Sequence, residues 1–192
     1  MSRQASSGSK GGSSGTLRII GGEWRRRVLR FPEAEGLRPT PDRVRETLFN
    51  WLGQDCSGMT CLDLFAGSGA LGFEAASRGA EKVLMVESAP KVAEALQTNA
   101  RLLAAEDRVE VLRQDAVKFA SSTPLRFDLV FLDPPYRQGW IEQISPLLPR
   151  LLHPEGLVYV EAEAPLEACG EWRTVKHGKA GQVYFHLMQQ EH

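Results

Sequence analysis

The sequence lacks several features that define whole classes of protein. Its 192 residues include three cysteines, Cys56, Cys61 and Cys169, and this odd, irregular set does not predict a disulfide framework. Cys56 and Cys61 lie close together, but no His or Cys pair completes a zinc site, so we expect no metal. Reduced thiols fit a cytoplasmic protein, which is the location that we expect.

Long apolar segments are also missing. No apolar run approaches the roughly 18 residues that are needed to span a bilayer, and the N-terminus lacks the apolar core of a signal peptide. We therefore expect no membrane contact. The net charge is only -1, so the protein is no polycation, and any binding of nucleic acid must depend on a local patch.

The composition is that of a globular protein, with 42% hydrophobic and 24% charged residues. Residues 1–15 are mostly Ser, Gly, Gln, Lys and Arg, and we expect them to be disordered because they cannot bury enough apolar area to offset the entropy of ordering. Residues 16–192 are then expected to form a single domain, which we take to be monomeric.

The beginning of this domain predicts a small β arm over residues 16–38. Two β-like runs, residues 17–20 and 27–31, flank Gly21-Gly22, which suggests a hairpin. Arg25, Arg26 and Arg27 lie together in this arm. They are compatible with RNA contact, and also with a solvated strand edge whose charge prevents aggregation.

A helix is predicted next. Thr40 is a suitable N-cap, Pro41 suits the first helical position, and Gly53 can close the helix in a left-handed conformation. Arg43 and Arg45 lie off the apolar stripe of this helix, so we expect both to be free to face a ligand.

Strand and helix patterns then alternate. Strands are indicated at residues 61–65, 82–87, 109–112, 127–132 and 156–160, and helices at residues 70–77, 90–103, 116–119 and 140–152. This alternation predicts an α/β fold in which helices cover both faces of a mostly parallel sheet. Two more strand-like runs, residues 172–175 and 183–187, are joined by a glycine-containing segment that suggests a hairpin.

In such a sheet, ligands bind beyond the carboxyl ends of the strands. Gly67, Gly69 and Gly72 form G-x-G-x-x-G after the first strand of the sheet, where glycines allow a tight turn and close approach to a ligand, or serve only as turn residues. Glu87 follows the second strand and can accept hydrogen bonds from both ribose hydroxyls of an adenosine, or is merely solvated. Asp115 can accept from an adenine amino group, or cap a helix.

The segment Asp133-Pro134-Pro135-Tyr136 follows the fourth strand and is the most informative part of the sequence. Consecutive prolines form a stiff segment that is poor in N–H donors, so the Pro134 carbonyl is free to accept. A carboxylate and a carbonyl can together hold the two hydrogens of an –NH2 group. Tyr136 offers a flat face on which a base can stack. The alternative is a stiff loop that only ends a buried strand.

Taken together, these motifs resemble those of class I amino-methyltransferases. Residues 18–22, 37–40 and 43–52 sharpen the likeness, and over residues 16–188 the sequence resembles the RsmD family. The resemblance implies a Rossmann-like, seven-stranded sheet whose last strand is antiparallel, and S-adenosylmethionine as cofactor. It further implies methylation of guanine N2 in 16S ribosomal RNA, with guanine 966 as the family's target, within an assembled or assembling small ribosomal subunit.

The resemblance also assigns roles to residues. It implies that the segment from Arg38 to Thr40 helps to cover the cofactor. The residues expected to contact the cofactor are Arg38, Thr40, Asp63, Phe65, Ala66, Gly67, Ser68, Gly69, Glu87, Ser88, Asp115, Ala116 and Asp133. Those expected at the reacting amino group are Asp133, Pro134, Pro135 and Tyr136, and those expected to contact RNA phosphates are Arg25, Arg26, Arg27, Arg43 and Arg45.

Three other functions remain open at this point. The same site could serve a methyltransferase that acts on amino groups of DNA or of another RNA. The glycines and Glu87 also fit an NAD-dependent oxidoreductase, which gives no role to Asp133-Pro134-Pro135-Tyr136 and for which we find no obvious catalytic His or Lys. A non-catalytic RNA-binding module is a third possibility, against which the intact Asp133 argues.

Overall fold

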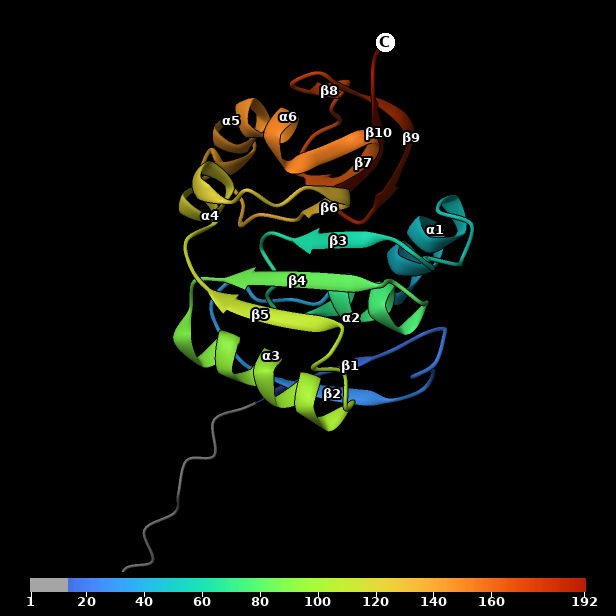
Figure 1. Ribbon diagram of the computed structural model, residues 1–192, viewed down its shortest axis with the longest axis vertical. Helices are drawn as coiled ribbons and strands as arrows, with labels where there is room; N and C mark the ends of the chain where they lie inside the picture. The colour runs from blue at the N-terminus through green and yellow to red at the C-terminus, as the bar shows by residue number, and fades with distance from the viewer. Residues whose placement is uncertain (1–13) are drawn as a thin grey trace, which may run out of the picture.

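An eight-stranded sheet forms the centre of the protein in a computed structural model that describes residues 14–192 (Figure 1). The strand order is β5-β4-β3-β6-β7-β10-β9-β8. The strands are β3 (Thr60–Asp63), β4 (Lys82–Glu87), β5 (Val109–Arg113), β6 (Phe127–Leu132), β7 (Leu152–Ala162), β8 (Ala168–Cys169), β9 (Trp172–Ala180) and β10 (Val183–Gln190).

The first five strands of this sheet are parallel, and β10 is antiparallel to both of its neighbours, β7 and β9. This arrangement confirms the expected Rossmann-like sheet with its antiparallel last strand. The two-residue strand β8 pairs with the outer edge of β9 and extends the expected seven strands to eight.

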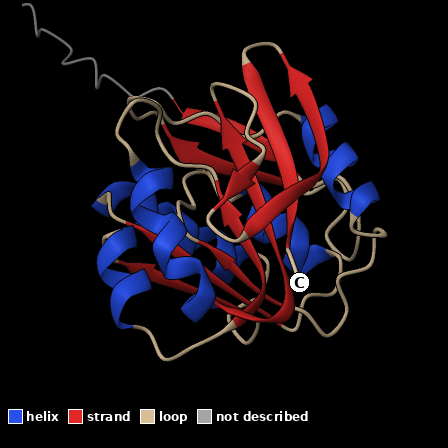
Figure 2. Cartoon of the chain, turned by 90° about the horizontal axis from the view of Figure 1, so that it is seen from above, coloured by secondary structure: helices blue, strands red, loops and turns tan. Residues whose placement is uncertain are grey.

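Helices cover both faces of the sheet (Figure 2). The helices of one face contribute Leu48, Phe73 and Leu96 to one buried cluster, whereas those of the other face contribute Phe119 and Leu148 to a second. The first group is α1 (Asp42–Trp51), α2 (Ala70–Ser77) and α3 (Pro90–Leu102), and the second is α4 (Ala116–Ser122), α5 (Trp140–Ile144), the 3₁₀ turn η1 (Ser145–Leu147) and α6 (Leu148–Leu151).

The predicted arm is a separate antiparallel pair, β1 (Ser14–Arg18) and β2 (Val28–Pro32), beside α3 (Figure 1). Its inward side chains include Leu17 and Leu29, which are buried. The arm begins earlier than expected, because Ser14 and Gly15 pair with Pro32 and Phe31 and are not part of a disordered tail. The Phe31 ring occupies the space that a side chain at residue 15 would need. The rest of the predicted disordered tail lies outside the described residues.

The boundaries of α1 differ at one end from the prediction. The N-cap is Pro41 and not Thr40, whose hydroxyl instead bonds to a side chain of β7. The C-terminal end is as expected. Gly53 has φ +85° and donates to the Asn50 carbonyl, while Gln54 N–H donates to the Phe49 carbonyl, which are the two bonds of a Schellman motif.

The helix predicted over residues 140–152 is interrupted. It consists of α5, η1 and α6, and Leu152 already belongs to β7. Pro146 and Pro149 lack the N–H groups that a continuous helix would need, which accounts for the breaks. None of the described helices is long and apolar enough to cross a membrane. The three cysteines are free and buried, and burial raises the pKa of the Cys56 thiol to about 11.

Candidate active site

The carboxyl ends of the central strands bring the predicted motifs to one edge of the sheet. Phe131 of β6 is the register partner of Asp63 at the end of β3, and Leu132 is the partner of Val160 in β7. The residues that follow these strands therefore share one edge, where ligands bind in open α/β sheets.

The glycine turn leads from β3 into α2. Gly67 and Gly69 have φ of +54° and +83°, a region that disfavours other residues, and Gly69 is the N-cap of α2. A Cβ at Gly72 would lie 2.5 Å from the Met85 side chain, so this glycine lets the helix pack closely on β4. Gly72 N–H donates to the Asp63 carboxylate at 3.0 Å. Gly67 and Gly69 are therefore required by the turn, and Gly72 by the packing of α2 on the sheet.

Glu87 at the end of β4 is fixed by backbone donors. One carboxylate oxygen accepts from Gly67 N–H at 2.8 Å and the other from Ala89 N–H at 3.1 Å. The side chain is half-buried and points back to the glycine turn. Each oxygen retains a further lone pair, so the carboxylate is oriented and can still accept from a ribose.

Asp115 precedes α4 and accepts from Lys118 N–H at 2.9 Å, so it is the N-cap of this helix. The structure thus confirms that Asp115 caps a helix, which was one of the two roles that its sequence position allowed. Its expected contact with adenine stays a prediction. Ala116 is buried in the first turn of α4.

The segment Asp133-Pro134-Pro135-Tyr136 leaves β6 at the centre of this edge. Pro134 is buried, whereas Tyr136 is 42% exposed and presents its ring at the surface. Phe65, before the glycine turn, and Trp140, at the start of α5, pack edge-to-face with ring centroids 5.5 Å apart. A segment placed in this way can offer a carboxylate, a carbonyl and an aromatic face to one ligand group.

Glu161 is a site residue that sequence reasoning missed. It follows Val160 in β7, is 4% exposed, and accepts on one oxygen from the Thr40 hydroxyl at 3.0 Å and from the Tyr159 hydroxyl at 2.7 Å. Glu161 lies one residue before the end of β7, but its partner Thr40 is 121 residues away, so no local pattern marked the contact.

Three carboxyl groups thus meet at this edge, from Asp63, Asp133 and Glu161. Burial, and then the neighbouring charge of Glu161, raise the pKa of Asp133 well above its ordinary value. Burial, and less strongly the charges of Glu87 and Glu161, raise the pKa of Asp63 to about 8. Within residues 14–192, no Lys, Arg or His lies within 4.0 Å of these carboxyl groups. Such a cluster fits a ligand that carries positive charge.

The segment before α1 lies over the glycine turn. The Leu37 side chain comes within 2.9 Å of the position that a Cβ on Gly67 would occupy. Thr40 is buried against Glu161, and Arg38 is exposed. The structure therefore brings this segment to the expected cofactor site. The other expected contacts are Ala66 and Ser68, buried in the turn, and Ser88, exposed after β4.

The arginines expected to contact RNA divide into two groups. Arg25, Arg26, Arg27 and Arg43 are exposed. The expectation for Arg45 is wrong, because its side chain is buried between α1, the arm and α2. It donates to the Thr40 and Arg18 carbonyls and to the carboxylates of Asp42 and Glu74. Arg45 is thus fully engaged inside the protein.

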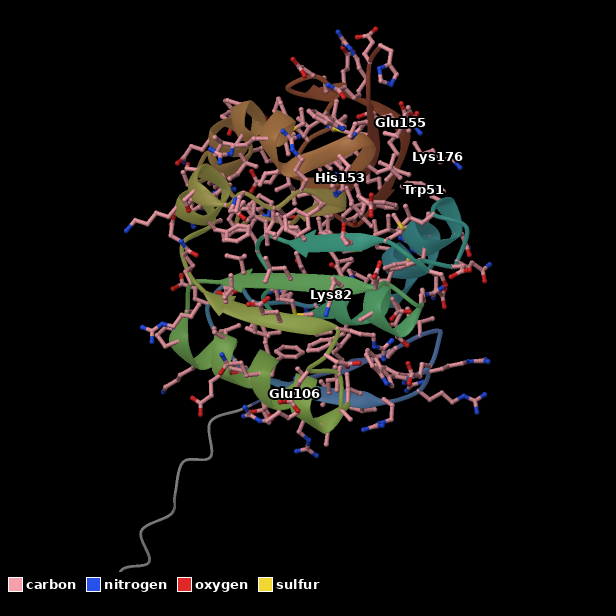
Figure 3. The ribbon with its side chains drawn as sticks, in the orientation of Figure 1. Trp51, Lys82, Glu106, His153, Glu155 and Lys176 are labelled. Carbon is pink, nitrogen blue, oxygen red and sulfur yellow. The ribbon has the colours of Figure 1, made fainter. Side chains whose placement is uncertain are left out.

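A groove of about 500 Å³ lies away from this site, around the amino ends of β4 and β5. Lys82 and Glu106 are among its lining residues (Figure 3). Its position at the opposite edge of the sheet separates it from the acidic cluster. Among residues 14–192, no group of three or more His, Cys, Asp or Glu side chains is placed to hold a metal ion.

Comparison with known proteins gives consistent matches along nearly the whole chain. The family model described as "Conserved hypothetical protein 95" matches residues 17–189. Ribosomal RNA small subunit methyltransferase D of Escherichia coli strain K12 is 43% identical over 183 residues, which cover 93% of this chain and 92% of that protein. The protein of the same name from Haemophilus influenzae is 44% identical over 184 residues, covering 92% and 95%.

Solved structures agree with these matches. The structure of yhhF from Escherichia coli has a TM-score of 0.82 at 42% identity and covers 92% of this chain and 99% of that chain. A Thermus thermophilus 16S rRNA N2 G1207 methyltransferase, solved with AdoMet and guanosine, has a TM-score of 0.71 at 22% identity. The match covers 93% of this chain and 50% of that one, and at this identity it shows the shared fold.

Proposed function

This chain belongs to the Conserved hypothetical protein 95 family, the RsmD family of methyltransferases, and from that membership we propose that it methylates 16S ribosomal RNA. The methyl group comes from S-adenosylmethionine and is transferred to the exocyclic N2 amino group of a guanine. The family target, guanine 966, is the proposed nucleotide.

The observation that carries this proposal is the position of Asp133-Pro134-Pro135-Tyr136. The segment lies at the carboxyl edge of the sheet, with its carboxyl group beside a buried acidic neighbour and its aromatic ring exposed. A carboxylate and a carbonyl can accept both hydrogens of an –NH2 group, and the ring can stack on the base. An amino group on a nucleobase is the substrate that suits this arrangement.

When bound, S-adenosylmethionine supplies an activated methyl group on a sulfonium. The glycine turn lets the backbone approach the cofactor closely, and Glu87 offers its adenosine portion a carboxylate whose orientation is fixed. Asp63, Asp133 and Glu161 provide three neighbouring carboxyl groups, whose ionised forms a bound cation would favour. These residues fit the group, which supports it as the cofactor.

The residues at the amino group act by positioning and by electrostatics. The target nitrogen is a poor nucleophile because its lone pair is delocalised into the ring. Hydrogen bonds to the Asp133 carboxylate and the Pro134 carbonyl favour a pyramidal nitrogen and stabilise the positive charge that develops on it. The proton lost afterwards goes to Asp133 or to water, since either is a competent acceptor.

The RNA is proposed to present one base to this edge and to extend past the opposite edge of the sheet, where the turn with Arg25, Arg26 and Arg27 packs near the C-terminal ends of α2 and α3. A target base must leave its stack to reach a buried acceptor, which costs least in an unpaired region. Tyr136 would hold the base, while Arg25, Arg26, Arg27 and Arg43 would contact phosphates. The substrate is proposed to be RNA within an assembled or assembling small subunit in the cytoplasm, bound by a monomeric enzyme.

One experiment separates this function from its rivals. The protein is incubated with methyl-labelled S-adenosylmethionine and with small ribosomal subunits from cells that lack it, naked 16S ribosomal RNA or duplex DNA. Label in N2-methylguanosine supports the proposal, and the ratio of subunit to naked RNA identifies the form recognised. Label in N6-methyladenine of DNA would support methylation of an amino group but would refute ribosomal RNA as the substrate. Binding of NADH in preference to S-adenosylmethionine would favour an oxidoreductase.

A further inference from the structure

The ends of β6 and β7 place two carboxyl groups side by side. Leu132 and Val160 are partners in the parallel register, so Asp133 and Glu161, the next residues of their strands, occupy the same level of the sheet. Neighbouring strands lie about 4.8 Å apart. Two carboxyl groups at such a separation do not both ionise readily, because their charges repel and Glu161 is buried.

Glu161 is held by hydroxyl groups and not by a cation. Thr40, from the segment before α1, donates to one oxygen of Glu161 at 3.0 Å, and Tyr159 of β7 donates to the same oxygen at 2.7 Å. Burial raises the pKa of Tyr159 well above its ordinary value, so its hydroxyl stays a donor. These bonds fix the orientation of the carboxylate but leave its charge uncompensated.

The surrounding titratable groups are also acidic. Asp63 faces the pair from the end of β3, and Tyr136 faces it from the loop that Asp133 begins. Glu87 and Glu163 lie further out. Arg38, before α1, is exposed, whereas two other arginines near this edge are engaged elsewhere. Arg137 lies 3.7 Å from Glu163, and Arg45 is bonded to Asp42 and Glu74.

We propose that Glu161 is a positioning residue whose carboxylate, beside Asp133, keeps a proton on Asp133 in the free enzyme, and that binding of the cationic cofactor releases this proton to solvent. A positive charge beside the pair favours the form in which both groups are ionised. Asp133 is then left as a full carboxylate, the form that accepts a hydrogen bond and stabilises positive charge on the target nitrogen. The inference rests on the proposed function only in taking S-adenosylmethionine as the cofactor.

The test is calorimetric titration of the protein with S-adenosylmethionine and with S-adenosylhomocysteine, whose sulfur is neutral. Each titration is run in two buffers of different ionisation enthalpy near neutral pH, which gives the number of protons released. The wild-type protein is expected to release more protons with S-adenosylmethionine than with S-adenosylhomocysteine. Glu161→Gln removes the neighbouring charge but keeps an oxygen for Thr40 and Tyr159, so most of this excess should disappear.

Two control variants test whether the released protons come from the Asp133–Glu161 pair. Glu163→Gln makes the same chemical change two residues away, at an exposed side chain beside Arg137, and should release as many protons as the wild type. Asp63→Asn measures the separate contribution of Asp63, whose pKa of about 8 also places it in this range. Most of that contribution should persist in Glu161→Gln, because burial is the main cause of the raised pKa of Asp63.

Unchanged proton release in Glu161→Gln would overturn the inference, as would equal release with the two cofactors in the wild type. The wild type also gives a test that needs no variant. Its affinity for S-adenosylmethionine should rise with pH by up to about tenfold per unit for each proton released, and a flat profile contradicts the inference. Normal cofactor binding without proton release refutes only this inference, whereas failure to bind either cofactor refutes the proposed function.

Discussion

At the scale of single residues, a substitution at Asp133 should affect methyl transfer far more than it affects cofactor binding. We expect Asp133→Ala to lower kcat by about 100-fold or more, because an acceptor for the developing charge is removed. Cofactor binding should change far less, since the glycine turn and Glu87 are untouched. Single-turnover methylation and calorimetry measure the two effects. Methylation at a near-normal rate would show that Asp133 is not the acceptor.

Asp63 should make the protein less stable as the pH rises. Its pKa is about 8 in the folded protein and 3.8 in the unfolded chain, so between these values the folded state holds a proton that the unfolded state has released. The free energy of unfolding therefore falls as the pH rises through this window, by at most about 1.4 kcal/mol per unit.

Asp63→Asn should remove that dependence while keeping an oxygen for Gly72 N–H. Urea unfolding of both proteins at several pH values between about 4 and 8 gives the difference in their free energies of unfolding. We expect the variant to gain stability relative to the wild type as the pH rises. A difference that stays constant across this range would mean that Asp63 is already ionised at its lower end.

At the scale of elements, Glu74 of α2 joins the arm to two helices. Its buried carboxylate accepts from Ile20 N–H and Gly21 N–H of the arm, from Arg45 of α1 and from Arg78. The Arg45 side chain also reaches the Thr40 carbonyl. The arm, the segment over the glycine turn and the two helices therefore depend on one buried ion pair.

Breaking this pair should destabilise the protein strongly. Arg45→Ala leaves Glu74 buried with less compensation, and removal of one partner of a buried pair costs about 3–5 kcal/mol. Arg43→Ala, on the exposed face of the same helix, should change stability by no more than about 0.5 kcal/mol. Denaturant unfolding compares the two variants. Equal stabilities would show that the buried network contributes little.

The sequence predicted those elements whose signals are local. The positive φ of Gly53 and the strand ends that carry Glu87 and Asp133 follow from residues close together in the chain. Arg45 and Glu161 could not be interpreted in this way, because their partners come from the arm and from a segment 121 residues away. The break after Ile144 was in principle predictable from Pro146 and Pro149.

At the scale of the whole molecule, the net charge of -1 means that RNA binding must be local. The arm and strands β8–β10 lie at opposite ends of the protein (Figure 1), so removal of arm arginines leaves the far end unchanged. We expect Arg25→Gln/Arg26→Gln to weaken RNA binding and to reduce the salt dependence.

The log–log slope of affinity against salt should become shallower by about 0.7 for each single-strand phosphate that the variant no longer neutralises. Filter binding or fluorescence anisotropy over a range of salt concentrations gives the slope. Arg173→Gln is the matched control, because Arg173 is exposed on β9 and paired with Glu191. If the control and the double variant have the same slope, the arm does not bind phosphate.

The position of β10 has a consequence for biosynthesis. This strand is the last element of the described chain, yet it lies inside the sheet, between β7 and β9. A ribosome delivers it after the other described strands, so the growing chain presents an unpaired edge on β7 until β10 has emerged. The nascent protein is therefore most prone to mispairing before β10 emerges, and chaperones that bind exposed strands would act on it during that interval.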